Sequence, residues 1–222
     1  MRQTICFDLD GTLTDPAEGI TRSIQYACSR LGLPPLQRHE LLFAIGPPIQ
    51  RTFALLLKTE ETQTIQAAVD LYRERYASQG MLEENTVYPD VEAMLLLLNE
   101  AGKRLYVATS KPTVYALRIL QHFGLDRHFA HIYGSELDGT RANKADLLAH
   151  VLENERLSSE NVAMVGDRMH DIAGARQNSL HSVGVTYGYG SVEELTQAGA
   201  EALCSTPGEV AEHFTGIMSG TK

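Results

Sequence analysis

Short apolar, β-branched runs alternate with longer helix-like segments over much of the chain. Continuous apolar runs of this kind are typical of strands that are buried on both faces of a parallel sheet. Four of them occur, at 4–7 (TICF), 104–109 (RLYVAT), 161–165 (NVAMV) and 181–185 (HSVGV). Helices are predicted between and after them, over about 90–101, 112–123, 143–156, 168–178, 191–198 and 207–217. This alternation predicts an α/β fold with a doubly wound, Rossmann-like parallel sheet.

One long segment, 15–85, breaks the alternation. It offers no confident strand, and its apolar residues recur at three-to-four spacing in three stretches, EGITRSIQYACSRLG, PPIQRTFALLLK and TQTIQAAVDLYRERYASQG. Such spacing is typical of amphipathic helices. We therefore predict two domains, an α/β core formed by 1–14 and 86–222 and a small all-α lobe, 15–85, inserted after the first strand.

Composition excludes several classes of partner. The 222-residue chain carries a formal net charge of −9 and has a pI near 5.3, which argues against a nucleic acid polymer or an anionic membrane as its main partner. The longest apolar runs are too short to span a bilayer, and the N-terminus lacks a signal-peptide pattern. Three cysteines without metal-ligand spacing suggest reduced, buried thiols. A cytoplasmic monomer or homodimer is expected.

The predicted strands end in residues that carry chemistry. Asp8 and Asp10 follow the first strand, and Thr109 and Ser110 end the second. Lys144 starts a later helix, and Gly166-Asp167 ends the NVAMV strand, with Asp171 four residues further on. Because ligands of open parallel sheets bind beyond the carboxyl ends of the strands, these groups are expected to meet at one place.

Several carboxylates crowded together repel one another unless a cation lies among them. The oxygen-only ligand set, with no His or Cys cluster, favours a hard ion, Mg²⁺ before others. Mg²⁺ takes few protein carboxylates and leaves room for a phosphate, whose oxygens suit Thr109, Lys144 and the backbone N–H groups after Asp8.

The chain resembles the haloacid dehalogenase-like (HAD) phosphohydrolase superfamily. DLDGT, Thr109-Ser110, Lys144 and GDRMHD occur in the order and approximate spacing of its four motifs, and the helical insert resembles its C1 cap (subfamily I). Several phrases, among them IGPPIQ, ATSKPTVYA, GSELDGTRANK and VTYGYGS, look closest to the HAD 5′-nucleotidase branch, beside phosphoglycolate-phosphatase-like proteins.

The resemblance implies roles for the residues of the first three motifs. Asp8 would be the nucleophile that becomes an aspartyl phosphate, and Asp10 the acid and base whose pKa should be raised. Thr109 and the amide of Ser110 would bind the phosphoryl group. Lys144 would neutralise Asp8 and the transferring oxygens.

The resemblance also implies a metal site. Mg²⁺ would be held by Asp8, the carbonyl of Asp10 and Asp167, while Asp171 would orient a metal-bound water. Thr12 would brace the loop after Asp8, and Gly11 would let the chain turn tightly without a Cβ.

Cap-loop residues are candidates for substrate contact. A Gly-Pro-Pro break between helices makes IGPPIQR (45–51) a loop that can reach back over the site, and the resemblance implies that this loop contributes to specificity. Gly46 and Arg51 are its candidate substrate contacts. Arg51 is equally well explained as a solvated first-turn arginine. GYGS (188–191) is predicted to be a loop that ends in the N-cap Ser191 and borders the site.

Other residues have two explanations each. Lys111 is either a phosphate contact or a solvated lysine at a helix start. Asp171 is either a helix N-terminal charge or part of the metal environment. Cys6 is expected to be a core thiol, and His170 a surface histidine. The near-copy ELDGT (136–140) follows the strand that HIYGS ends, and we interpret it as a connector that aims Lys144 at Asp8 rather than as a second site.

Within the superfamily, Asp10 argues against a dehalogenase, and the absence of a lysine in IGPPIQR argues against a phosphonatase. A phosphomutase stays open. The predicted function is Mg²⁺-dependent hydrolysis of a small phosphomonoester, a nucleoside 5′-monophosphate first and phosphoglycolate or another small metabolite second. Alternatives from another class are a phosphoreceiver-like signalling module and an inactive metabolite-binding protein.

Overall fold

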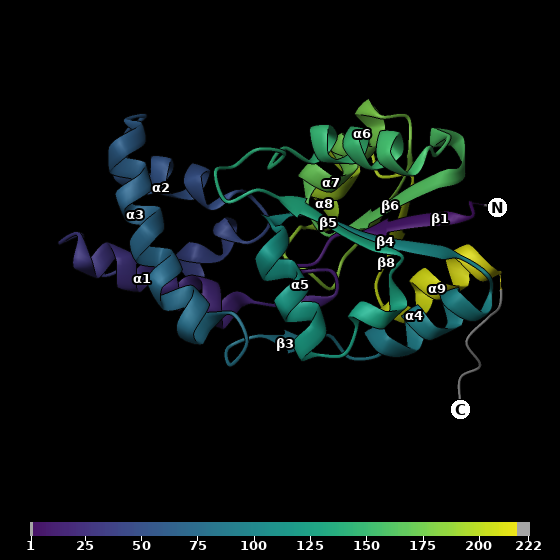
Figure 1. The fold of residues 1–222 in the computed structure, drawn as a ribbon, viewed down its shortest axis with the longest axis horizontal. Coiled ribbons are helices and arrows are strands. Elements are labelled where there is room, and N and C mark those ends of the chain that lie inside the picture. The colour runs from purple at the N-terminus through teal and green to yellow at the C-terminus, as the bar shows by residue number, and fades with distance from the viewer. Residues whose placement is uncertain (1, 217–222) are drawn as a thin grey trace.

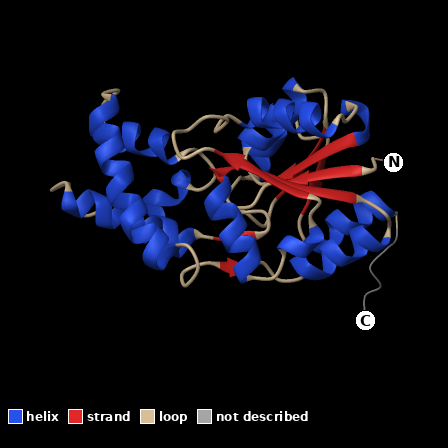
Figure 2. Ribbon diagram, in the orientation of Figure 1, coloured by secondary structure: helices blue, strands red, loops and turns tan. Residues whose placement is uncertain are grey.

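A six-stranded parallel sheet forms the centre of the core lobe. The computed structural model describes residues 2–216. The sheet has the order β5-β4-β1-β6-β7-β8, so that the first strand lies in the interior (Figures 1 and 2). In chain order its strands are β1 (Thr4–Phe7), β4 (Arg104–Pro112), β5 (His131–Ser135), β6 (Val162–Gly166), β7 (His181–Val185) and β8 (Ala202–Cys204).

Helices cover both faces of this sheet. Figure 1 shows α6, α7 and α8 on one side and α4, α5 and α9 on the other. Successive side chains of β1 alternate between these layers: Ile5 and Phe7 belong to the larger apolar cluster, and Cys6 to the smaller one. The helices are α4 (Val91–Glu100), α5 (Thr113–His122), α6 (Lys144–Glu155), α7 (Met169–Gln177), α8 (Val192–Ala198) and α9 (Pro207–Thr215), with short 3-10 turns at Asp126–His128 and Ser159–Asn161.

The predicted doubly wound α/β fold is confirmed, and the four strands predicted from apolar runs are present. β5 was expected only as the strand that HIYGS ends, and β8 was missed. The three-residue edge strand β8 is too short to show a hydrophobic period, and it pairs only with β7. β4 also continues three residues past the predicted end at 109, to Pro112. Among residues 2–216, no helix combines the length and apolar character needed to cross a bilayer.

The helical insert follows β1 and stands beside the core (left in Figure 1). An antiparallel pair of two-residue strands, β2 (Thr14–Asp15) and β3 (Thr86–Val87), joins the chain where it leaves and re-enters the core. This ribbon was not predicted, because two residues show no period. The insert contains α1 (Ala17–Arg30), a 3-10 helix (Arg38–Ala44), α2 (Ile49–Leu57), α3 (Thr62–Arg75) and a π-helical turn (Tyr76–Gly80). Its boundaries as a separate domain, 15–85, stay a prediction.

α1 crosses the π-helical turn at two glycines. A Cβ added to Gly19 would lie 1.9 Å from the carbonyl oxygen of Gly80, and one added to Gly80 would lie 2.8 Å from that of Gly19. No side chain fits between the two backbones at this crossing. The two backbones are therefore in close contact near the point from which the chain returns to the core.

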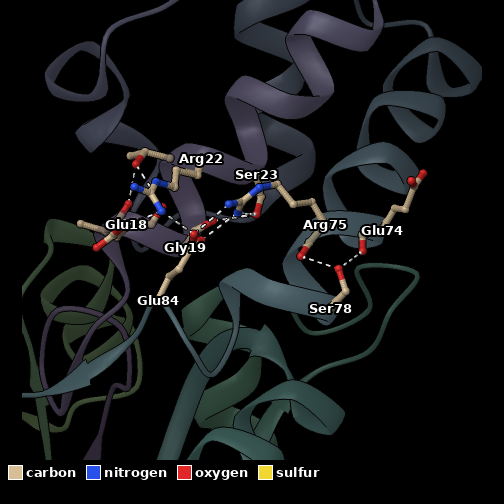
Figure 3. A network of polar contacts seen from close by, with 10 residues as sticks. Glu18, Gly19, Arg22, Ser23, Glu74, Arg75, Ser78 and Glu84 are labelled. Atoms are coloured by element: carbon tan, nitrogen blue, oxygen red, sulfur yellow. Dashed lines mark hydrogen bonds and ion pairs between the residues drawn. The ribbon is translucent and has the colours of Figure 1, made fainter.

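An ion network centred on the largely buried Glu84 stabilises the same end of the insert. Figure 3 shows Glu84 between Arg22 of α1 and Arg75 at the end of α3. Both guanidinium nitrogens of Arg75 lie 2.8 Å from Glu84 carboxylate oxygens, and Arg22 Nη1 lies 2.7 Å from the same carboxylate. Arg75 also donates to the Ser23 hydroxyl at 3.3 Å, which in turn donates to the carbonyl of Gly19. Glu84 thus connects three segments of the insert.

Replacing Glu84 with Gln is expected to lower the free energy of unfolding by about 1.5–3 kcal/mol, the range for a hydrogen bond to a charged group. Hydrogen bonds from Arg75 lower the pKa of the Glu84 carboxyl from its ordinary 4.5. The stabilisation is therefore present above that ordinary value and is lost as the pH falls through the lowered pKa of the folded state. Urea unfolding of both proteins between pH 7 and pH 3 measures it. The control Glu18→Gln, at a more exposed carboxylate that pairs with Arg22, should change stability little. A Glu84→Gln difference that does not shrink toward low pH would contradict the assignment.

All three cysteines are free and buried, as predicted. Burial raises the pKa of the Cys6 thiol to about 12 and that of Cys204 to about 11, so that almost no thiolate forms near neutral pH. We expect the folded protein to react slowly with an aromatic disulfide reagent at pH 8 and to release all three thiols once denatured. Rapid labelling of Cys6 in the folded protein would refute its assignment to the core.

Candidate active site

Three neighbouring strands bring the first, second and fourth motifs together. Asp8 directly follows β1, which pairs in parallel with β4 on one side and with β6 on the other. Thr109 lies in the last part of β4, and Asp167 follows the last residue of β6. Asp8, Thr109 and Asp167 are all buried. The sheet order therefore places the predicted nucleophile between the other two motifs.

Lys144 joins two of the carboxylates. It is the first residue of α6, whose N-cap Asn143 accepts hydrogen bonds from the N–H groups of Ala145 and Asp146. The Lys144 ammonium lies 3.0 Å from Asp8 Oδ1 and 2.8 Å from Asp171 Oδ1, and it donates to the carbonyl of Ala108. Burial alone would lower the pKa of Lys144, but the charges of Asp171 and Asp8 outweigh this and raise it. Lys144 is thus a permanent cation against Asp8.

Asp167 lies in a cradle of glycine backbone. A Cβ on Gly11, whose φ is +85°, would lie 2.2 Å from Asp167 Oδ2, and one on Gly188 would lie 2.4 Å from Asp167 Cβ. Asp167 Oδ2 accepts a 2.8 Å hydrogen bond from the N–H of Tyr189, so the predicted GYGS loop does border the site. The Thr12 hydroxyl approaches Asp167 Oδ1 at 3.4 Å. Gly11 is needed for close approach to this carboxylate.

Asp171 is both a charge at a helix N-terminus and a member of the acidic cluster, the two roles that the sequence left as alternatives. Its Oδ2 accepts from the N–H of Arg168 at 3.1 Å, as an acidic side chain in the first turn of α7 does. Its Oδ1 pairs with Lys144 beside Asp8. The helix-terminal position therefore delivers this carboxylate to the acidic cluster.

Asp8, Asp167 and Asp171 form a buried acidic triad. Each offers a carboxylate oxygen within 4.8 Å of the others. Burial, together with the charges of Asp171 and Asp8, raises the pKa of Asp167 well above its ordinary value. A cation among these oxygens would reverse that shift, because it favours the ionised carboxylates. The triad therefore has the donor chemistry of a site for a hard metal ion.

Lys111 lies in the site, and the interpretation as a solvated lysine is wrong. Its side chain is 6% exposed, and its ammonium lies 2.6 Å from Asp10 Oδ2 and 2.6 Å from the hydroxyl of Tyr76, to which it donates. Burial raises the pKa of Asp10, as predicted, although Lys111 opposes the shift. The sequence around Lys111 and Tyr76 does not predict the contact between them, because it depends on how the insert packs on the core.

The buried charges of the site do not balance by themselves. Asp8, Asp10, Asp167 and Asp171 are four buried carboxyl groups, and Lys111 and Lys144 are two buried amines, so the acidic groups outnumber the basic ones. A divalent cation would offset this excess. The charge balance is a second reason, independent of the donor geometry, to expect a metal ion.

The loop IGPPIQR closes over Asp8 and Asp10 as expected. Gly46, Pro47 and Pro48 line a cavity of about 60 Å³ together with both aspartates, Thr109 and Ser110. Gly46 has a φ of +100°, and a Cβ there would lie 2.9 Å from Arg168 Cγ. Arg168 also donates to the carbonyl of Ile45 and pairs with Glu194 at 2.9 Å. Arg168, which the sequence analysis passed over, therefore links the fourth motif to this loop.

Arg51 lies apart from this cavity. It is exposed and lines a neighbouring cavity of about 230 Å³ that also contains Ser110, Lys144 and His170. His170 is half-buried, and burial and the charge of Arg51 lower its pKa. Substrate contacts by Gly46 and Arg51 stay predictions.

The near-copy ELDGT forms an exposed turn between β5 and α6. Asp138 Oδ1 accepts from the N–H of Thr140 at 2.8 Å, and Glu136 pairs with Arg141. Arg73 of the insert donates to the carbonyl of Leu137, so the turn also touches the other lobe. Its carboxylates are exposed, unlike those of DLDGT, and it leads directly into Lys144.

The match to a family model decides the identity of this arrangement. Residues 5–185 match the family described as haloacid dehalogenase-like hydrolase. The chain belongs to that family. The span includes all four motifs and the whole helical insert, and the chain is a HAD-type phosphatase.

The chain is also similar to several named proteins. The chain is 50% identical over 191 residues to a 5′-nucleotidase from Pseudomonas aeruginosa, covering 86% of each protein. It is 39% identical to tyrosine-protein kinase PtkA from Mycobacterium tuberculosis, covering 86% of this chain and 64% of PtkA. It is 33% identical to a phosphoglycolate phosphatase from Agrobacterium fabrum, covering 84% of this chain and 81% of that protein.

Among solved structures, the fold is similar to that of a predicted phosphatase from Clostridium acetobutylicum. The TM-score is 0.94 at 40% identity, covering 98% of this chain and 100% of the other. The arrangement of insert and core is therefore shared with a phosphatase-like protein of known structure.

Proposed function

We propose that this HAD phosphatase hydrolyses a small phosphomonoester through an aspartyl phosphate on Asp8. The observation that carries the proposal is the placement of Asp8, which is buried at the end of β1 with the Lys144 ammonium 3.0 Å away. A carboxylate in this position can act as a nucleophile, and the neighbouring cation offsets the charge of the incoming phosphate.

Each remaining site residue has a part in the proposed reaction. Thr109 and the amide of Ser110 bind the oxygens of the transferring group. Asp10 donates a proton to the leaving oxygen and then accepts one from the hydrolytic water. Burial raises the pKa of Asp10, the direction that a general acid requires, while Lys111 opposes the shift.

Mg²⁺ is the proposed metal. The buried carboxylates of Asp8 and Asp167 and the carbonyl of Asp10 would hold it, and Asp171 would orient its hydration. When bound, the ion would supply charge stabilisation for the transferring phosphoryl group. Removing divalent metal with EDTA is expected to abolish turnover, Mg²⁺ to restore it, and Ca²⁺ to restore much less, because Ca²⁺ prefers a larger coordination shell. Full activity in EDTA would contradict the metal site.

A nucleoside 5′-monophosphate is the proposed substrate. The support is the 50% identity to a protein named 5′-nucleotidase over 86% of both chains. Phosphoglycolate is the alternative, on the weaker identity to a phosphoglycolate phosphatase. The insert residues Gly46, Pro47 and Pro48 line the cavity beside Asp8 and Asp10, so we infer that the lobes separate to admit a nucleotide. A cytoplasmic location and a monomeric or homodimeric state stay predictions.

Phosphate release from a panel of nucleoside monophosphates, phosphoglycolate and sugar phosphates tests the substrate. We expect the highest kcat/KM with a nucleoside 5′-monophosphate. A higher value with phosphoglycolate would select the alternative, and transfer of phosphate within a sugar phosphate would indicate a mutase. Stable phosphorylation of the protein without turnover would favour the signalling module, and binding without either would favour an inactive protein.

A further inference from the structure

One lysine of the core, Lys111, connects Asp10 to the helical insert. Lys111 belongs to β4 of the core, and Tyr76 begins the π-helical turn of the insert. The Lys111 ammonium lies 2.6 Å from Asp10 Oδ2 and 2.6 Å from the Tyr76 hydroxyl, and its side chain is 6% exposed. The contact between the lobes therefore ends on the proposed acid.

The two oxygens of Asp10 are in different situations. Oδ2 pairs with Lys111, whereas Oδ1 is buried and has no hydrogen-bond partner within residues 2–216. A buried carboxyl oxygen without a partner is costly, and its presence calls for an explanation. A carboxyl fixed through Oδ2 presents Oδ1 as the atom that can exchange a proton with a substrate.

Lys111 is held in place by its backbone. The pairing of β4 with β5 shifts register between Ala108 and Pro112, and irregularities of this kind re-aim side chains next to active sites. A Cβ on Gly134 of β5 would lie 2.5 Å from the carbonyl oxygen of Lys111, so the two backbones are in close contact. Ser135 also donates to the carbonyl of Ser110 at 2.8 Å.

Tyr76 is held by both lobes. Its ring stacks on Tyr72 of α3 at a centroid distance of 5.1 Å and meets Tyr115 of α5 edge-on at 5.9 Å. The preceding residue, Arg75, is part of the ion network with Glu84 (Figure 3). π-Helical turns are frequent at functional sites, and this one begins at Tyr76. Tyr76 as a whole is only 1% exposed. Its hydroxyl therefore has little freedom to leave Lys111 while the lobes are closed.

We propose that Tyr76 and Lys111 are positioning residues for Asp10, and that they orient its carboxyl for proton transfer only when the insert is closed on the core. The proposal rests on the proposed phosphatase reaction and deepens it. Separation of the lobes removes Tyr76 from Lys111, and Lys111 then loses one of its two buried contacts. The acid is therefore oriented only after the substrate has been enclosed.

The proposed proton transfer accompanies cleavage of the ester bond. Asp8 attacks phosphorus with a carboxylate lone pair, the ester P–O bond breaks, and its electron pair goes to the leaving oxygen. The proton of Asp10 Oδ1 passes to that oxygen. The products are the aspartyl phosphate on Asp8, an alcohol and the Asp10 carboxylate, whose new charge lies beside the Lys111 ammonium.

Comparison of two leaving groups separates positioning of the acid from other roles. A nucleoside 5′-monophosphate releases an alkoxide that needs a proton, whereas p-nitrophenyl phosphate releases a phenolate that is stable without one. The ratio kcat/KM reports steps up to the first irreversible one, here the formation of the aspartyl phosphate. Only loss of acid positioning lowers kcat/KM for the nucleotide and leaves kcat/KM for p-nitrophenyl phosphate nearly unchanged.

For Lys111→Met we expect kcat/KM for the nucleotide to fall about 10- to 100-fold, a part of the usual general-acid contribution. For Tyr76→Phe we expect a smaller fall of about 5- to 10-fold. Values for p-nitrophenyl phosphate should change less than about 3-fold in both. Lys111→Arg keeps a cation and should recover much of the nucleotide activity. The double variant should be no worse than Lys111→Met alone, because Tyr76 acts through Lys111.

Matched controls exist at the far end of β4 and on the opposite face of the sheet. Lys103 is also a buried lysine, but its ammonium donates to the carbonyl of Arg2. Tyr106 is also a buried tyrosine, but its hydroxyl donates to Glu155. Lys103→Met and Tyr106→Phe should leave the ratio of the two kcat/KM values unchanged.

Equal losses with both substrates would overturn the proposal, since they would mean that Lys111 binds phosphate or only supports the fold. Unchanged values in both variants, or additive losses in the double variant, would also overturn it. If Lys111→Met does not fold, Tyr76→Phe alone decides, because it keeps the ring and removes only the hydroxyl. A wild-type protein that hydrolyses neither ester would instead show that the proposed function is wrong.

Discussion

Replacing Asp8 with Asn is expected to abolish measurable turnover while the protein stays folded. The amide has nearly the same shape as the carboxylate but is not a nucleophile, so the aspartyl phosphate cannot form. It also removes one of the repelling charges of the triad of Asp8, Asp167 and Asp171, and Lys144 keeps its ion pair with Asp171, so stability should not fall greatly. Phosphate release and urea unfolding measure the two effects.

The near-copy of the motif provides a matched control for this experiment. Asp138→Asn makes the same chemical change in ELDGT, where the side chain is exposed and bonds within its own turn. We expect Asp138→Asn to keep full activity, because an amide oxygen can still accept from the N–H of Thr140. Retained turnover in Asp8→Asn, at more than trace levels, would rule out Asp8 as the nucleophile.

Replacing Lys144 with Ala is expected to reduce both activity and stability. The rate should fall about 100-fold or more, because the transferring oxygens lose a charge partner in a site shielded from water. Without metal, the free energy of unfolding should also fall by about 3–5 kcal/mol, the cost of removing one partner of a buried ion pair. Lys144 pairs with both Asp8 and Asp171, and both would be left without their cation.

Measurements in EDTA and in Mg²⁺ distinguish the two effects of Lys144→Ala. Mg²⁺ should recover part of the stability, because it neutralises the same carboxylates, but not the rate. Lys103→Ala is the control, since it removes a buried lysine whose partner is the carbonyl of Arg2, far along β4 from the site. A mild loss of rate in Lys144→Ala would count against its placement on the reacting phosphate.

The sequence alone determined the core fold and the meeting point of its motifs. Parallel strands such as β1 and β6 are apolar on both faces, so their sequences are distinctive, and their carboxyl ends necessarily share one edge. For that reason Asp8, Thr109 and Asp167 could be grouped without coordinates. Lys144 was found because its helix start follows a strand end, and the motif order made its role recognisable.

Short elements escaped sequence analysis for a physical reason. β8 has three residues, and β2 and β3 have two each, which is too few for any period of apolar residues. These strands form because neighbours already in place offer backbone partners. Their existence is therefore a property of the assembled chain rather than of its local pattern.

Contacts between the lobes were decided by the tertiary structure. A lysine after a strand has the same sequence signature whether its ammonium lies in water or between two buried groups. Only the packing of the insert on the core brings the Tyr76 hydroxyl to Lys111, and so turns a residue with two explanations into a buried partner of Asp10. Arg168 likewise gained its link to Ile45 from that packing. Local sequence determines which groups stand at the strand ends, but it does not determine what the insert lays over them, because that depends on residues distant in the chain.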